Sequence, residues 1–157
     1  SELFHQRDRC SMIRSIVTSP VFLQIPSTNA TQSDRVIGED LKETLQAHAH
    51  ECVGMAANMI GVSKRIIAVK DTVAHAGKKV LQAPIILMYN PEITQSRNPY
   101  ETTEGCLSLS STRSTTRYEH ITVCYLDEHF KKQTRQFSGY TAQIIQHEID
   151  HCNGILI

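Results

Sequence analysis

The sequence predicts one α+β domain that spans residues 1–157. Two observations predict this class: two segments have the apolar spacing of helices, and several short segments have the composition of strands, two of them joined by a polar turn as in an antiparallel hairpin. The length of 157 residues falls within the range of about 100 to 200 that is usual for one domain. We therefore expect a single hydrophobic core.

The first predicted helix spans Asp34–Cys52. Its apolar residues recur at steps of three and four, which places them on one face. Ser33 or Asp34 is suited to cap its start, and the preceding residues Pro26–Ser33 are rich in Ser, Thr and Asn, as in a surface loop. The pattern is typical of an amphipathic helix that packs on a sheet.

Four short segments are predicted to be strands, because they are apolar, partly β-branched and, in the later ones, alternating. The polar residues Asp127–His129 separate the last two and favour a hairpin. The predicted strands are Arg65–Lys70, Ile85–Asn90, Tyr118–Leu126 and Phe130–Phe137.

The last predicted element is a helix from about Tyr140 to Cys152. Ser138 or Thr141 lies near its start, and Gly154 is suited to the left-handed conformation that follows many helices. This helix contains the residues of greatest chemical interest.

Charge and cysteine content limit the partners and the compartment. The 16 basic and 16 acidic residues balance, so nothing attracts the chain to polyanions, and we expect no nucleic acid or membrane partner. No apolar run approaches the roughly 18 residues of a membrane-spanning helix. The five cysteines are odd in number and widely spaced, which favours free thiols and a cytoplasmic location.

The final helix carries an H-E-x-x-H motif, with His147, Glu148 and His151. Four residues are about one helical turn, so both imidazoles project from the same face and can bind one metal ion. Glu148 lies about 100° further around the axis than His147, where a carboxylate can exchange a proton without binding the ion. The motif indicates a metal-dependent hydrolase but does not name its reaction.

The third ligand is expected upstream of the motif. Six residues follow His151, and none of them is His or Glu. Cys106 lies in Glu104–Ser108, reading E-G-C-L-S, where Gly105 permits an unusual backbone approach and a thiolate suits borderline-soft divalent ions. We predict a Cys-His-His site with an open fourth position.

The E-G-C-L-S and H-E-I-D-H blocks, together with Cys52–Gly61 in the place of the family's G-x-G-x-A-A-x-Q segment, resemble the peptide deformylase family over roughly residues 12–157. The resemblance implies an α+β domain in which antiparallel strands pack around the central metal-bearing helix. It also implies removal of the N-formyl group from the formyl-methionine of new polypeptides.

The resemblance implies the roles of five residues. Cys106, His147 and His151 bind one divalent ion, commonly Fe²⁺, with Zn²⁺, Ni²⁺ or Co²⁺ able to replace it. Glu148 acts first as general base and then as general acid. The backbone N–H of Leu107 donates a hydrogen bond to the oxyanion.

Five residues are predicted to bind the substrate. Val53, Met55 and Ile144 are candidates to line an apolar pocket for the methionine side chain. Gly54 offers backbone groups to an extended peptide, and Met59 stands where the family has a glutamine that donates a hydrogen bond to the oxyanion.

Met59 is the main departure from the family, because a thioether donates no hydrogen bond. Loss of one such donor costs about 10²- to 10³-fold in rate. Asn58 in a rearranged position, or a bridging water, would replace the donor. Without such a replacement, the chain is a weakened or silent paralogue that binds metal or peptide. A third alternative is an amidase with a different acyl or peptide preference. Retention of Glu148 favours the active enzyme.

Two further expectations concern the surroundings of the motifs. A carboxylate of Glu104 or Asp150 paired with Arg113 or Arg117 would hold the Cys106 segment against the helix. Many relatives continue into another helix that helps engage the ribosome, and little chain follows His151 here. We therefore do not expect docking of that kind.

Overall fold

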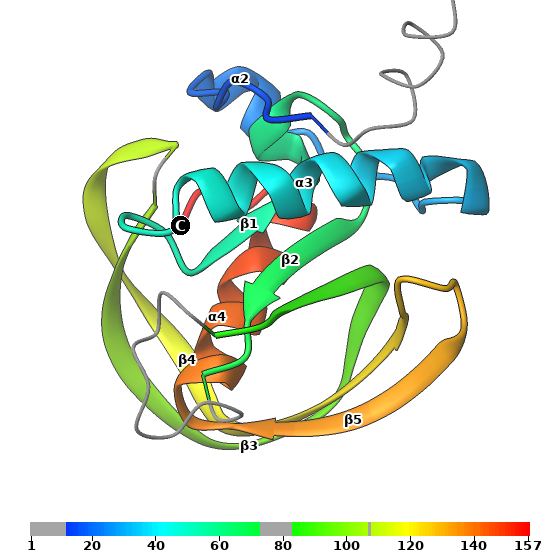
Figure 1. The fold of residues 1–157 in the computed structure, drawn as a ribbon. Helices are drawn as coiled ribbons and strands as arrows, with labels where there is room; N and C mark the ends of the chain where they lie inside the picture. The colour runs from blue at the N-terminus through cyan, green and yellow to red at the C-terminus, as the bar shows by residue number, and fades with distance from the viewer. Residues whose placement is uncertain (1–11, 73–82, 107) are drawn as a thin grey trace, which may run out of the picture.

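A computed structural model describes residues 12–72, 83–106 and 108–157, and these residues form an α+β fold around one long helix (Figure 1). Five strands form one antiparallel sheet in the order β1-β2-β3-β4-β5. The strands are β1 (Gly54–Ala56), β2 (Ile66–Lys70), β3 (Ile85–Cys106), β4 (Leu109–Leu126) and β5 (Lys132–Ser138).

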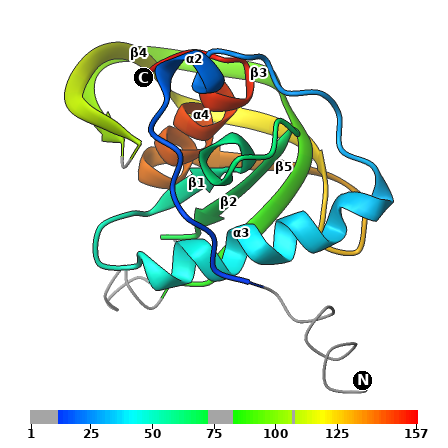
Figure 2. The same ribbon diagram turned by 90° about the horizontal axis from the view of Figure 1, so that it is seen from above.

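The long strands β3 and β4 curve around helix α4 (Gly139–Cys152), which lies inside the curve (Figure 1). Helix α3 (Arg35–Ala47) lies on the side of β1 and β2, and the short helix α2 (Pro20–Leu23) packs near η2 (Ala57–Ile60), as Figure 2 shows from above. The prediction of strands packed around the motif-bearing helix is confirmed.

Strands β3 and β4 are much longer than the sequence predicted, since Ile85–Asn90 and Tyr118–Leu126 are only parts of them. The segments that were not predicted, the second half of β3 and the first half of β4, pair with each other, for example at Tyr100 and Arg117. Most side chains from Glu92 to Thr103 in β3 are exposed or half-buried, so the apolar alternation that reveals a strand is absent. Backbone pairing, together with three register shifts along this ladder, determines the structure there.

The two main helices differ from prediction at their ends. Helix α3 ends at Ala47, five residues before the expected end, because the chain turns through His48, whose N–H bonds Thr44 and Leu45. Asp34 caps no helix α3 N–H; it accepts a bond from the Thr31 backbone in the short turn η1 (Gln32–Asp34). Helix α4 matches its prediction, and Gly154 has φ +76° as expected.

Helix α4 is buried along most of its length, which fixes its position relative to the sheet. Ala142, Ile145 and Ile149 join the hydrophobic core with residues of α3, β1 and β2. The cysteines of the described ranges, Cys52, Cys106, Cys124 and Cys152, are free thiols, as expected for those four. Among the described helices, none has both the length and the apolar character needed to cross a membrane.

Candidate metal centre and its cavity

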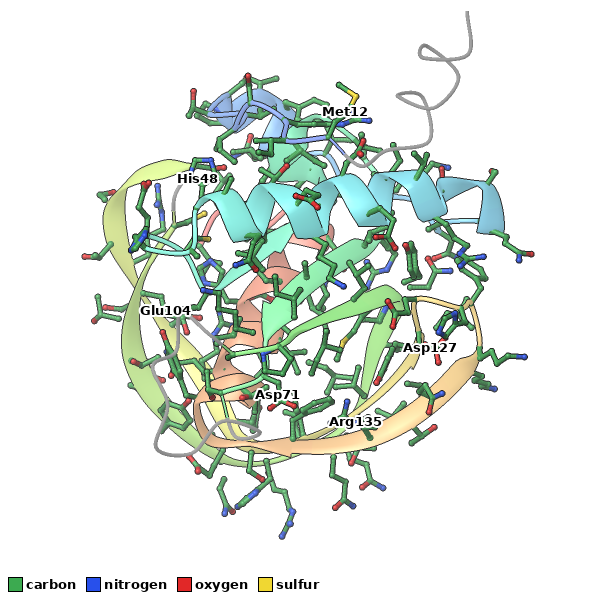
Figure 3. The ribbon with its side chains drawn as sticks, in the orientation of Figure 1. Met12, His48, Asp71, Glu104, Asp127 and Arg135 are labelled. Atoms are coloured by element: carbon green, nitrogen blue, oxygen red, sulfur yellow. The ribbon has the colours of Figure 1, made fainter. Side chains whose placement is uncertain are left out.

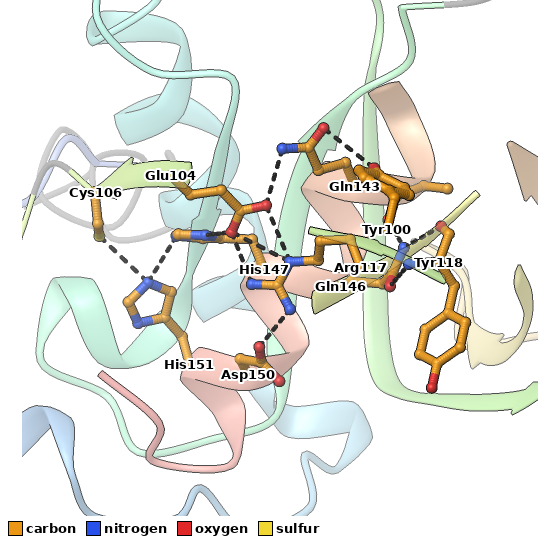
Figure 4. A network of polar contacts seen from close by, with 11 residues as sticks. Tyr100, Glu104, Cys106, Arg117, Tyr118, Gln143, Gln146, His147, Asp150 and His151 are labelled. Carbon is orange, nitrogen blue, oxygen red and sulfur yellow. Dashed lines mark hydrogen bonds and ion pairs between the residues drawn. The ribbon is translucent and has the colours of Figure 1, made fainter. Parts of the chain in front are cut away.

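Cys106, His147 and His151 come together in space. The Cys106 Sγ lies 3.2 Å from Nε2 of His151, which lies 3.1 Å from Nε2 of His147, and the three ligand atoms are all within 4.8 Å of one another (Figure 4). The two histidines come from one turn of α4, and the cysteine ends β3. The predicted set of ligands is therefore assembled in one place.

Glu104 fixes the orientation of the His147 ring. Its Oε1 lies 2.7 Å from Nδ1 of His147, and burial leaves both groups little contact with solvent. Because Nδ1–H donates to this carboxylate, Nε2 is the ring nitrogen that faces Cys106 and His151. The orientation suits a metal ligand.

The pKa values of the two histidines are shifted in opposite directions. Burial lowers the pKa of His147, but hydrogen bonds with Cys106 and Glu104 outweigh it and raise that pKa to about 10. Burial, followed by repulsion from His147, lowers the pKa of His151 to about 3. His151 is thus a neutral imidazole at pH 7, and an ion that binds Nε2 of His147 would displace a proton.

Arg117 connects Glu104 to helix α4. Its guanidinium donates to Glu104 at 2.7 Å and to Asp150 at 2.6 Å, and only 4% of its side chain is exposed. Burial raises the pKa of Glu104, but hydrogen bonds from His147 and Arg117 outweigh it and lower that pKa to about 2. The sequence left two arginines open, and the structure selects Arg117. The side chain of Arg113 bonds the backbone carbonyl of Ser111 and forms no ion pair with Glu104 or Asp150 among the described residues.

A cavity of about 850 Å³ opens beside the ligands. Of the predicted substrate-binding residues, Val53, Gly54, Met59 and Ile144 line it. Met55 does not: it is fully buried in the core. Cys106, His147 and Glu148 form part of the same wall, so this cavity gives access to the candidate metal site.

Glu148 is buried at the cavity wall, with 4% of its surface exposed. Burial raises its pKa to about 7, and no described residue forms a hydrogen bond with its Oε1. A carboxyl group with that pKa both takes and gives a proton near neutrality. Gly54 lies so close that a β-carbon there would be 2.9 Å from Oε2 of Glu148.

Asn58 and Met59 do not place a hydrogen-bond donor in the cavity. The Asn58 amide donates to the backbone carbonyl of His151 at 2.8 Å, and Asn58 does not line the cavity. The Met59 sulfur accepts a hydrogen bond from the Ala56 backbone at 3.4 Å. Asn58 therefore supports the helix rather than replacing the family's glutamine. Leu107, predicted to donate its N–H to the oxyanion, lies outside the described residues.

Several residues that line the cavity were not predicted, among them Cys52, Tyr140 and Gln143. The signal for two of them was present, because Tyr140 and Gln143 precede His147 by seven and four residues and so share its helix face. Their polar character concealed them when only apolar residues were considered as a lining.

Comparison with known proteins decides the family. The family described as polypeptide deformylase matches residues 15–157. The chain belongs to this family. A peptide deformylase of Clostridium beijerinckii is 49% identical over 146 residues, which are 93% of this chain and 100% of that protein. A peptide deformylase of Synechocystis is 34% identical and covers 85% of this chain and 71% of its own.

Solved deformylase structures agree with the fold. The peptide deformylase of Ehrlichia chaffeensis in complex with actinonin has a TM-score of 0.78 and 32% identity, covering 92% of this chain and 86% of its own. The Acinetobacter baumannii enzyme with Met-Ala-Ser bound has a TM-score of 0.76 and 27% identity, covering 93% and 96%. The deformylase assignment makes the chain a metal-dependent hydrolase, and these relatives support the active enzyme over the silent paralogue.

Proposed function

We propose that the chain removes the formyl group from the N-terminal formyl-methionine of new polypeptides, using one divalent ion held by Cys106, His147 and His151. The observation that carries this proposal is the convergence of three ligand atoms within 4.8 Å beside a cavity that Glu148 also lines. Within the described ranges the group has three possible ligands, and a set of three protein ligands is typical of a catalytic rather than a structural metal site.

The residues fit a divalent ion. One thiolate and two imidazoles suit Fe²⁺, which we expect as the native ion, and also Zn²⁺, Ni²⁺ or Co²⁺. When bound, such an ion supplies a nucleophile at neutral pH by lowering the pKa of water, and it polarises the formyl carbonyl. A thiolate ligand exposed to the cavity is open to oxidation, so we expect the iron form to be oxygen-sensitive.

Glu148 moves the proton. Its carboxylate takes a proton from the attacking water as the new C–O bond forms. It then gives that proton to the amine nitrogen as the C–N bond breaks, releasing formate and a free N-terminus. Its burial and its pKa of about 7 support both steps.

Substrate binding involves the cavity wall in this proposal. Val53, Gly54 and Ile144 contact the peptide or its methionine side chain, and Met55 supports this wall from the core. Strand β1 contains Gly54 and is an edge strand of the described sheet, so an extended peptide can pair along it. The Leu107 N–H remains the proposed oxyanion donor, and Met59 contributes no such bond.

The setting of the proposed reaction is the cytoplasm, where new polypeptides emerge. The balanced charge of the chain gives no support for direct binding to nucleic acid or membranes.

The test is a deformylation assay on a formyl-methionyl tripeptide. The protein is prepared anaerobically with iron, or reconstituted with nickel or cobalt, and compared with Glu148→Gln. We expect turnover in the wild type and a loss of at least about 10²-fold in the variant, with the ion still bound. An ion-loaded wild type without turnover would refute the proposal.

A further inference from the structure

Gln143 is an amide side chain in the wall of the cavity, one helical turn before the metal ligand His147. Two neighbours hold it. Its Nε2 donates to Oε2 of Glu104 at 2.9 Å, and its Oε1 accepts from the Tyr100 hydroxyl at 3.4 Å (Figure 4). Its orientation is thereby fixed, with the nitrogen directed toward the metal-binding residues.

The amide retains hydrogen-bonding capacity. A glutamine carries two N–H donors and two acceptor lone pairs, and the contacts found among the described residues use one donor and one lone pair. Gln143 is only half-buried, on the cavity side. A second N–H is therefore free to meet a bound molecule.

The position of Gln143 along α4 determines which part of a substrate it meets. The face of α4 that lines the cavity carries His147, then Gln143 and Ile144, then Tyr140, each about 5 Å further from the metal-binding end. The formyl carbon must lie at that end. The formyl carbon carries a hydrogen in place of a side chain. The rest of the cavity is therefore available to the amino acid whose nitrogen bears the formyl group.

A methionine side chain that extended from that nitrogen along α4 would bring its sulfur to the level of Gln143 and Ile144, the next residues on this face. These two residues form a mixed wall, with one amide and one aliphatic side chain. A purely apolar wall would rank side chains by hydrophobicity alone, whereas an oriented donor favours an atom that accepts a hydrogen bond.

We propose that Gln143 determines specificity, by donating its second N–H to the atom at the sulfur position of the substrate side chain. The inference rests on the proposed deformylase function and deepens it. The cavity is thus selective for side chains with an acceptor at that position over hydrocarbons of the same length.

The test uses three formyl tripeptides that differ at one atom. The first residue is methionine, norleucine or methoxinine, which have S, CH₂ and O at the same position. For the wild type and Gln143→Met, kcat/KM is measured on each. The expected result is a methoxinine-to-norleucine ratio that falls about three- to tenfold in the variant, as for the loss of one hydrogen bond.

The ratio separates selectivity from a general loss. Gln143→Met also removes a bond to Glu104, but that change acts on all three substrates alike. Ile144→Val is the matched control, since it trims the same wall without changing its donors, and should leave the ratio unchanged. Gln143→Leu repeats the test with another apolar shape.

The dissociation constants of the three unformylated tripeptides are also measured on nickel-loaded protein, without need of turnover. The same loss of selectivity in Gln143→Met would support the inference even if no substrate were cleaved, an outcome that would refute only the deformylase proposal. If Gln143→Met and Gln143→Leu both leave the methoxinine-to-norleucine ratio unchanged, in kcat/KM and in the dissociation constants, the proposed role of Gln143 is wrong.

Discussion

Glu104 Oε1 lies 2.7 Å from Nδ1 of His147, and the same carboxylate accepts bonds from Arg117 and Gln143. One buried carboxylate thus contacts a candidate metal ligand, forms a salt bridge with Arg117 and holds a residue of the cavity wall. Figure 3 shows Glu104 on the side of the molecule opposite Asp127 at the β4–β5 turn. The arrangement predicts that Glu104 acts on metal binding through His147.

We expect Glu104→Gln to weaken metal binding by about 10- to 100-fold, because an uncharged amide supports the His147 ring less well than a carboxylate. Competition with a chelator for zinc or nickel measures the affinity. Glu92→Gln, at an exposed position of the same strand, is the control. Equal affinities in the two variants would contradict a supporting role for Glu104.

Arg117→Met should lower the free energy of unfolding by about 3 to 5 kcal/mol. The substitution leaves the carboxylates of Glu104 and Asp150 without their buried partner. Urea unfolding of the metal-free protein measures the loss. Arg113→Met, at a position with more solvent contact, should lose less than about 1 kcal/mol. A similar loss in both would mean that the pairing is not specific.

Gly54→Ala should reduce kcat by about 10- to 100-fold, because the new β-carbon would lie 2.6 Å from Ile144 and 2.9 Å from Glu148, and both must move. Gly105→Ala is the matched control for stability, since its nearest neighbour would be Thr112 at an ordinary 3.7 Å. Steady-state kinetics and thermal unfolding together check the prediction. A fully active Gly54→Ala protein would show that the described contact is not required.

Met59→Gln should raise kcat by about 10²-fold. The new side chain can accept from the Ala56 backbone through its oxygen, as the sulfur does now, while its N–H groups are available to the cavity. The effect belongs in kcat more than in KM, because the donor acts on charge that develops during the reaction. An unchanged kcat would indicate that the oxyanion is already fully stabilised.

Asp127→Ala should cost about 1 to 2 kcal/mol at neutral pH, because its carboxylate accepts from the backbone N–H groups of His129 and Lys131 and from Gln133. The bond from Lys131 contributes most to lowering the pKa of Asp127 below its ordinary 3.8. A lowered folded-state pKa gives stability that is complete above the unfolded pKa and lost as the pH falls through the folded one.

The stability difference between wild type and Asp127→Ala should therefore be constant from about pH 5 to 8 and narrow below pH 3.8. Urea unfolding at several pH values measures it. Glu128→Ala, at the exposed neighbouring position, is the control variant. A difference that grows toward acid would reverse the assigned sign.

The candidate metal-site residues were easier to predict than the full extent of the strands that surround them. Helical spacing predicted that His147 and His151 share a face, and the E-G-C-L-S block pointed to Cys106; the structure brings the three ligand atoms within 4.8 Å of one another. The outer parts of β3 and β4 could not be found, because exposed polar strands held by backbone pairing leave no hydrophobic period.

The side-chain contacts of the site could not be predicted from the sequence for a different reason, because they depend on which elements pack together. Arg113 and Arg117 are four residues apart and so lie on the same face of β4. The contact of Arg117 with Asp150 of α4 decides which arginine is buried, and only the folded structure shows that contact. Gln143 was not predicted to line the cavity. Its orientation depends on two hydrogen bonds, to Glu104 and from Tyr100, that the sequence does not reveal.

X-ray absorption spectroscopy of the nickel- or zinc-loaded protein tests the central claim most directly. We predict one ion per chain with one sulfur and two imidazole nitrogens in its first shell, and loss of the sulfur signal in Cys106→Ser. A first shell without sulfur in the wild type, or an identical spectrum for Cys106→Ser, would contradict the proposed metal centre.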